Sequence, residues 1–198
     1  FNTTNAPLLG AKHAIYRERP ILSINNTSKT YGTDDPAQPI SGFVNGDSGG
    51  LTGSVTRTSG ELVGGTYNIA KGTIASNVGY GFALAGTPTL TITKADLTAS
   101  IANQTKIYGE DDPALTGITP TLSGLVNRSV ATWDGAVSVN DSALTSTTTD
   151  LTRVLGEGIG ARTITGGTFS AVTGGNYNAP TLAGTPTLTI TKADLTAS

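Results

Sequence analysis

The segment LAGTPTLTITKADLTAS at residues 84–100 recurs letter for letter at residues 182–198. Its central part, TLTIT at residues 89–93, alternates polar and apolar side chains, so that Leu90 and Ile92 share one face of an extended chain and the threonines share the other. This period of two predicts a strand with one buried face. The recurrence predicts that one folding unit occurs twice and that the segment lies where one unit ends and the next begins.

Three further pairs of segments recur in the same order. They are KTYGTDDPA at 29–37 and KIYGEDDPA at 106–114, SGFVN at 41–45 and SGLVN at 123–127, and GELVG at 60–64 and GEGIG at 156–160. We therefore expect a first unit at residues 21–94 and a second unit at residues 95–192, with an insertion at residues 127–155. Residues 1–20 resemble the end of a preceding unit, and residues 193–198 repeat the opening strand of a unit.

The composition favours an all-β protein. Threonine suits the pleated surface of a strand, and the 26 glycines supply turns. TYNIA at residues 66–70 has the same alternation as TLTIT, with Tyr67 and Ile69 on one face. The absence of cysteine excludes disulfides and thiolate metal sites. With 12 basic and 14 acidic residues, the sequence offers no charge pattern for nucleic acid, and no apolar run approaches the ~20 residues of a membrane span.

The ordered motifs YGxDDPA, GFVNGD, VGGTYNI and LTITKADLT resemble those of the MBG-type (YGX-type) tandem repeats of bacterial surface adhesins, which include filamentous-haemagglutinin-like proteins. The resemblance covers both units. It implies two tandem small β domains of β-grasp or immunoglobulin-like sandwich type, in a secreted, extracellular or cell-surface protein. The second unit departs from the pattern, with VNRS at residues 126–129 where the first has VNGD, and Arg162-Thr163 where the first has Thr66-Tyr67.

The sequence offers almost nothing for catalysis. The single histidine, His13, lies in the N-terminal segment, so neither a Ser-His-Asp triad nor a two-histidine metal site is expected. GDSGG at residues 46–50 lacks the Lys-Ser/Thr pair and the helix of a phosphate-binding loop. We expect no enzyme activity and no cofactor.

The repeated Asp-Asp-Pro motif has two interpretations. Asp34, Asp35, Asp111 and Asp112 could supply oxygen ligands to calcium, which needs roughly six to eight of them. Adjacent aspartates cannot both point inward, and aspartate before proline commonly forms a turn. We favour the turn.

The only tryptophan, Trp133, lies in the insertion. A tryptophan on a loop can stack on a sugar or enter a pocket of a partner protein. The other interpretation is a lid over the end of a small core, which we favour because tryptophan is mostly buried.

Lys29 and Lys106 occupy matching positions near strand ends. One hypothesis is that each forms an isopeptide bond to an asparagine. The interpretation we favour is an exposed lysine that discourages pairing at a sheet edge.

The unit boundary, TITKADLTAS at residues 91–100, contains no glycine and no turn signal. We expect one continuous strand to leave the first unit and enter the second, which would make the junction stiff. The leading hypothesis is a non-enzymatic structural protein, either an adhesin stalk or an extracellular filament. The alternative is a module that binds a glycan or host protein through the insertion around Trp133.

The two ends of the sequence allow two further interpretations. The chain is either part of a longer array of repeats or the subunit of a filament. In a filament, the terminal strand would pair with residues 1–19 of the next copy, by strand addition to an open edge. The residues of that strand are Ala193, Asp194, Leu195, Thr196, Ala197 and Ser198.

Overall fold

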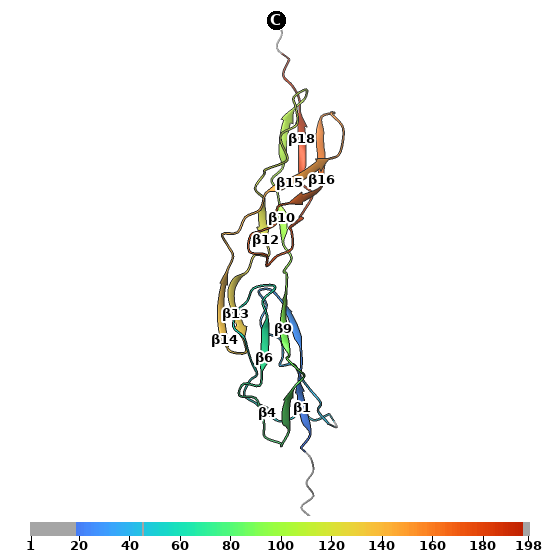
Figure 1. Cartoon of the computed structure of the whole chain (residues 1–198). Helices are drawn as coiled ribbons and strands as arrows, with labels where there is room; N and C mark the ends of the chain where they lie inside the picture. The colour runs from blue at the N-terminus through green and yellow to red at the C-terminus, as the bar shows by residue number, and fades with distance from the viewer. Residues whose placement is uncertain (1–18, 45, 196–198) are drawn as a thin grey trace, which may run out of the picture.

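The computed structural model describes residues 19–44 and 46–195, and within these the protein is an elongated array of short strands without a helix. Two units follow one another along the long axis (Figure 1). The all-β prediction is confirmed.

Nine strands form the first unit and nine form the second. The first unit comprises β1 (Ile21–Ile24), β2 (Thr27–Thr30), β3 (Ile40–Ser41), β4 (Leu51–Thr52), β5 (Thr56–Arg57), β6 (Tyr67–Ala70), β7 (Ala75–Ser76), β8 (Gly81–Leu84) and β9 (Thr89–Thr93). The second comprises β10 (Thr98–Ser100), β11 (Gln104–Ile107), β12 (Thr121–Ser123), β13 (Asn127–Thr132), β14 (Gly135–Asn140), β15 (Thr148–Arg153), β16 (Gly160–Phe169), β17 (Thr181–Leu182) and β18 (Thr187–Thr191).

Each unit contains the same two mixed sheets. In the first unit the orders are β3-β1-β8 and β2-β9-β6-β5, and in the second they are β12-β10-β17 and β11-β18-β16-β15. The opening strands pair in parallel with the closing ones, β1 with β8 and β2 with β9, whereas the other neighbours in these two sheets are antiparallel. The chain therefore changes sheets between β1 and β2, and again between β10 and β11.

The register of the sheets corrects one detail of the repeat alignment. Tyr67 lies opposite Leu90 in β9, and Arg162 lies opposite Leu188 in β18. Leu90 and Leu188 are the same position of the repeated TLTIT segment. The counterpart of Tyr67 is therefore Arg162, so the expected match to Thr163 was one residue out.

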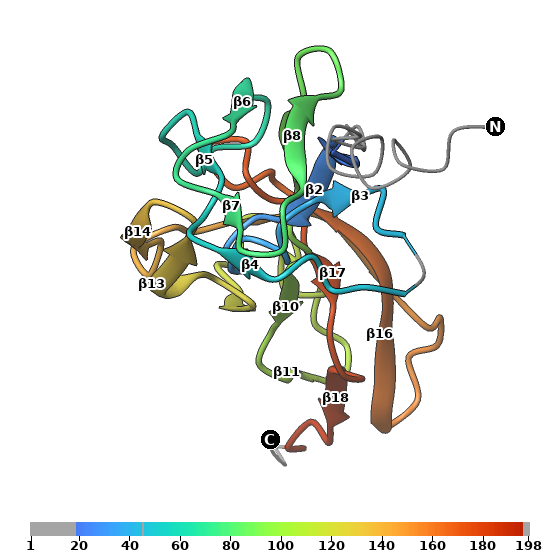
Figure 2. The ribbon, with the colours of Figure 1, turned by 90° about the horizontal axis from the view of Figure 1, so that it is seen from below.

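The second unit has an additional hairpin, β13–β14, that extends from its own sheets toward the first unit. Figure 2 shows this hairpin and β16 on opposite sides of the long axis. The hairpin is formed by the predicted insertion, and the turn Trp133-Asp134 joins its two strands.

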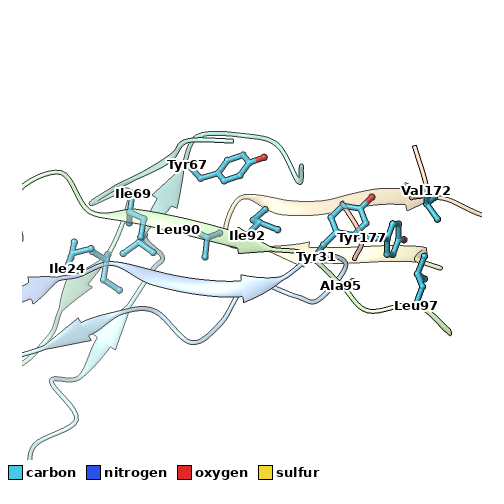
Figure 3. Close-up of a cluster of buried hydrophobic side chains, with 12 residues drawn as sticks. Ile24, Tyr31, Tyr67, Ile69, Leu90, Ile92, Ala95, Leu97, Val172 and Tyr177 are labelled. Carbon is cyan, nitrogen blue, oxygen red and sulfur yellow. The ribbon is translucent and has the colours of Figure 1, made fainter. Parts of the chain in front are cut away.

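The main hydrophobic core crosses the junction between the units (Figure 3). As the alternation predicted, Leu90 and Ile92 are buried and the intervening Thr91 is exposed. The core consists of Ile24, Tyr31, Val55, Tyr67, Ile69, Ile74, Leu90 and Ile92 from the first unit and Ala95, Leu97, Val172 and Tyr177 from the second. A smaller core, built from Ala99, Leu151, Ile164 and Phe169, lies within the second unit.

The connection between the units is extended but is not the single continuous strand that we expected. Strand β9 ends at Thr93 and β10 begins at Thr98. Between them, Ala95 forms an isolated parallel bridge with Tyr177. The interruption occurs because the partners change here, from β2 and β6 on one side to β12 and β17 on the other.

Candidate functional site: the junction between the units

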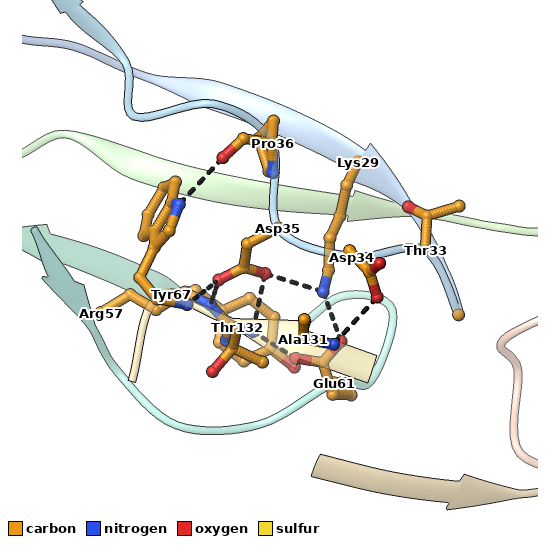
Figure 4. A network of polar contacts seen from close by, with 12 residues as sticks. Lys29, Thr33, Asp34, Asp35, Pro36, Arg57, Glu61, Tyr67, Ala131 and Thr132 are labelled. Carbon is orange, nitrogen blue, oxygen red and sulfur yellow. Dashed lines mark hydrogen bonds and ion pairs between the residues drawn. The ribbon is translucent and has the colours of Figure 1, made fainter. Parts of the chain in front are cut away.

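Four charged side chains form a buried network at the end of the first unit (Figure 4). Lys29 Nζ donates to Asp35 Oδ1 at 2.8 Å and to Glu61 Oε2 at 2.6 Å. Arg57 donates through Nε to Asp35 Oδ2 at 2.8 Å and through Nη2 to Glu61. The two positive and two negative charges balance, which a buried set requires.

Burial and ion pairing shift the pKa values of Asp35 and Arg57 in opposite directions. Burial by itself would raise the pKa of Asp35, but hydrogen bonds from Arg57, from Lys29 and from the Trp133 N–H hold that pKa below its ordinary value. Burial would lower the pKa of Arg57, yet its bonds to Asp35 and Glu61 raise it. Within the network, the shifted pKa values of Asp35 and Arg57 both favour the charged, ion-paired form.

The β13–β14 hairpin of the second unit covers this network. The Asp35 N–H donates to the Ala131 carbonyl at 2.8 Å, and the Trp133 N–H donates to Asp35 Oδ2 at 3.1 Å. On the other side, the Arg57 N–H donates to Asp134 Oδ2 at 2.9 Å. The hairpin therefore bonds to the two residues, Asp35 and Arg57, that hold the network together.

The rim of the contact is polar. Asp34 Oδ1 accepts hydrogen bonds from the Ala131 N–H at 2.9 Å and from Arg128 Nη2 at 2.6 Å. Trp133 donates its indole N–H to the Pro36 carbonyl at 2.9 Å. The Asp34–Arg128 pair is about half exposed, so it contributes little energy and mainly fixes the position of the hairpin.

Two tyrosines form a further contact at the base of the hairpin, where the Asp141 N–H donates to the Val126 carbonyl at 2.8 Å. The hydroxyls of Tyr31 and Tyr177 both donate to Asp141 Oδ2, at 2.8 and 2.6 Å, and the rings meet edge to face. Burial and the nearby carboxylate of Asp141 raise the pKa of Tyr177 to about 12 and raise that of Tyr31 as well. Both phenols therefore remain protonated donors at neutral pH.

Gly32 explains why glycine follows the tyrosine of the YG motif. Its φ is 79°, and a Cβ placed on it would lie 2.2 Å from Val126 Cγ2 of the second unit. The counterpart Gly109 has a φ of 88°, but nothing lies within 4 Å of its Cβ position.

These two glycines offer a matched test of the junction. Both Gly32→Ala and Gly109→Ala pay about 1–2 kcal/mol for the left-handed backbone. Only Gly32→Ala also collides with Val126, so we expect it to lower the urea midpoint of the first unit clearly more than Gly109→Ala lowers that of the second. Equal decreases in the two midpoints would contradict the close approach of the two units.

The comparison with protein families agrees with this organisation. Residues 21–91 match the family model described as MBG domain (YGX type). We therefore call the first unit the MBG domain, after the family model that it matches. The match confirms the resemblance inferred from the YGxDDPA motif, and MBG domains are structural repeat modules of surface-associated proteins. Searches of curated proteins and of solved structures found no match. Among the described residues, no helix is long and apolar enough to cross a membrane.

The second unit repeats the ion network of the MBG domain without its cover. Lys106 contacts Asp112 at 2.7 Å and Glu157 at 2.5 Å, and Arg153 bonds to the same two carboxylates. These contacts are those of Lys29 and Arg57 atom for atom. Yet the Asp112 side chain is 38% exposed against 1% for Asp35, and that of Glu157 is 56% exposed against 6% for Glu61.

The predicted site residues fall into three groups. Asp34 and Asp35 lie in the junction, where they accept hydrogen bonds from cations and N–H groups; Asp112 lies in the uncovered network and Asp111 beside it. Trp133 is half buried against the MBG domain. Of the terminal strand, Ala193–Leu195 is exposed and unpaired by any strand of the described chain, whereas Thr196–Ser198 and residues 1–18 lie outside the described residues.

The expectation for Lys29 and Lys106 was wrong. Strand β2 is indeed at the edge of its sheet, but Lys29 is buried, and so is Lys106 at the matching edge. The reason is that each lysine ammonium forms ion pairs with two carboxylates, which hold it against the protein and away from solvent. Arg57 and Glu61 were not predicted, although the motif TRxxGE that contains them occurs at both 56–61 and 152–157.

Proposed function

We propose that this chain is a non-enzymatic, extracellular structural module in which the two units act as one stiff spacer, as in the stalk of a surface adhesin. The observation that carries the proposal is the junction itself. The units share a hydrophobic core, the β13–β14 hairpin bonds to the ion network of its neighbour, and Tyr31 and Tyr177 share one acceptor. Three separate contacts oppose both bending and rotation about the connecting segment.

The glycan- or protein-binding alternative assigns Trp133 to an outside partner. In this chain its indole N–H is already donated to Pro36, and its ring packs against the core at the junction. Both observations support the spacer over the binding module. A filament of associating copies is a second form of the same proposal. Light scattering distinguishes the two forms by comparing the mass of particles formed by the full chain with that of a chain ending at Lys192.

The spacer role predicts that the two units tumble as one body. We expect residual dipolar couplings measured for β1–β9 and for β10–β18 to fit a single alignment tensor, because the contacts leave the connecting segment no free rotation. Two tensors of different orientation would overturn the proposal, whereas glycan binding that is lost in Trp133→Ala would favour the alternative.

A further inference from the structure

The outer end of the second unit presents the same residue types that contact the second unit from the MBG domain at the junction. In the MBG domain, the contacts to the hairpin and to Asp141, which directly follows it, come from Tyr31, Gly32, Asp34, Asp35, Pro36 and Arg57. Their counterparts in the second unit are Tyr108, Gly109, Asp111, Asp112, Pro113 and Arg153. Every side chain type is retained.

All of these counterparts except Pro113 line an open hollow of about 430 Å³. Its lining residues are Lys106, Tyr108, Gly109, Glu110, Asp111, Asp112, Arg153 and Glu157. Its ion network holds the same internal bonds as the covered one. The hydrogen bonds of Arg153 and Lys106 lower the pKa of Asp112 to about 2, so the face stays charged and preorganised. No internal rearrangement of the network is needed before a partner binds.

The residues that pack at the junction are apolar again at this end, but exposed. Tyr31 is 4% exposed, whereas Tyr108 is 53% exposed. Val63 donates its N–H to Asn176 Oδ1 and packs on the junction core, and its counterpart Ile159 is exposed. An aromatic ring and a half-open ion network thus line the hollow, and an exposed aliphatic side chain lies two residues after Glu157 in the sequence.

We propose that this face binds the hairpin of another unit of the second type, in the way that the MBG domain binds β13–β14. In the arriving unit, the hairpin counterpart of Arg128 would pair with Asp111 and that of Trp133 would donate to the Pro113 carbonyl. The counterpart of Asp141, just after the hairpin, would accept from Tyr108. The partner must come from another unit, because the hairpin of this chain is already engaged. A unit of the first type does not fit, since residues 46–50 stand where the second unit has its hairpin.

This inference rests on the proposed spacer role but can fail separately, since the existing two units can be rigid while the outer face binds nothing. The repeat supplies the test. Residues 193–198 are identical to residues 95–100, so a chain running 1–198 and then 101–198 adds a third unit of the second type through the native connecting sequence.

The readout is the nitration rate of Tyr108 by tetranitromethane, followed by mass spectrometry. The added unit has phenylalanine in place of its own counterpart of Tyr108, because the peptides of the two units would otherwise be identical. We expect it to fall roughly tenfold in the extended chain, in line with the exposures of 53% and 4% for Tyr108 and Tyr31. Tyr31 should react slowly in both chains. A control chain, in which the added unit has alanine in place of its counterparts of Arg128 and Trp133, should restore much of the reactivity.

Two results would overturn the proposal. One is an unchanged Tyr108 rate in an extended chain whose three units are all folded by NMR, which would assign the face to solvent or to a different partner. The other is a third unit that stays unfolded, because the same sequence folds against the MBG domain and should fold against an equivalent face.

Discussion

Asp35→Asn should lower the free energy of unfolding of the first unit by about 3–5 kcal/mol, the usual cost of removing one partner from a buried ion pair. The substitution leaves Lys29 and Arg57 with a single carboxylate, so one positive charge stays buried without compensation. It also weakens the acceptor for the Trp133 N–H. Trp133 is the only tryptophan, so its fluorescence in a urea titration reports on this contact directly.

Asp112→Asn is the matched control for this prediction. Asp112 makes the same bonds, to Lys106 and Arg153, but water reaches 38% of its side chain and can solvate the cations after the change. We therefore expect a much smaller loss, measured by the near-ultraviolet circular dichroism of the second unit. Equal losses at the two positions would show that the cover provided by the hairpin does not determine the strength of the network.

The all-β fold and the repeat could be predicted because both depend on patterns within short segments of the sequence. The alternation of TLTIT requires one buried face, and Leu90 and Ile92 occupy it in the structure. Strand partners could not be predicted in the same way. Parallel pairing of β1 with β8 joins segments about 60 residues apart, and nothing in either segment specifies the other.

The candidate site could be predicted only in part. The Asp-Asp-Pro motif was recognised as important, but its local sequence suggested a turn, whereas Asp35 bonds to residues that are distant along the chain. Likewise the burial of Lys29 depends on Glu61, which is 32 positions away. An ion network assembled from two strands and two loops has no local period, so only its repetition in both units could reveal it.

The contact surface of the insertion could not be predicted from the sequence either. Its tryptophan predicted either a binding loop or a lid, and both interpretations placed Trp133 against something outside the insertion. The structure supplies the MBG domain as that surface, through Pro36. Sequence could not identify this surface, because a hairpin contacts whatever its neighbouring unit presents, and the relative placement of two units is not encoded in either one alone.

Replacing residues 128–139 by a short glycine-serine linker should uncouple the two units. The change removes the bonds to Asp34, Asp35 and Pro36 together and opens the ion network of the first unit to water, as in the second unit. We expect separate alignment tensors for the two units and a lower urea midpoint for the first. Ser138→Ala, on the exposed side of the hairpin, should leave both properties unchanged and serves as the control.

The result separates what the hairpin contributes to the stiffness of the junction from what the remaining contacts contribute. Tyr31, Tyr177 and Asp141 remain in the variant, as does the buried segment through Ala95 and Leu97. If the units stay aligned, these contacts suffice for a spacer, and the hairpin serves mainly to shield the charges of its neighbour. If the common alignment is lost while both units remain folded, the hairpin is the element that makes the two units rigid relative to each other. A third unit would then be added at the exposed face around Asp112.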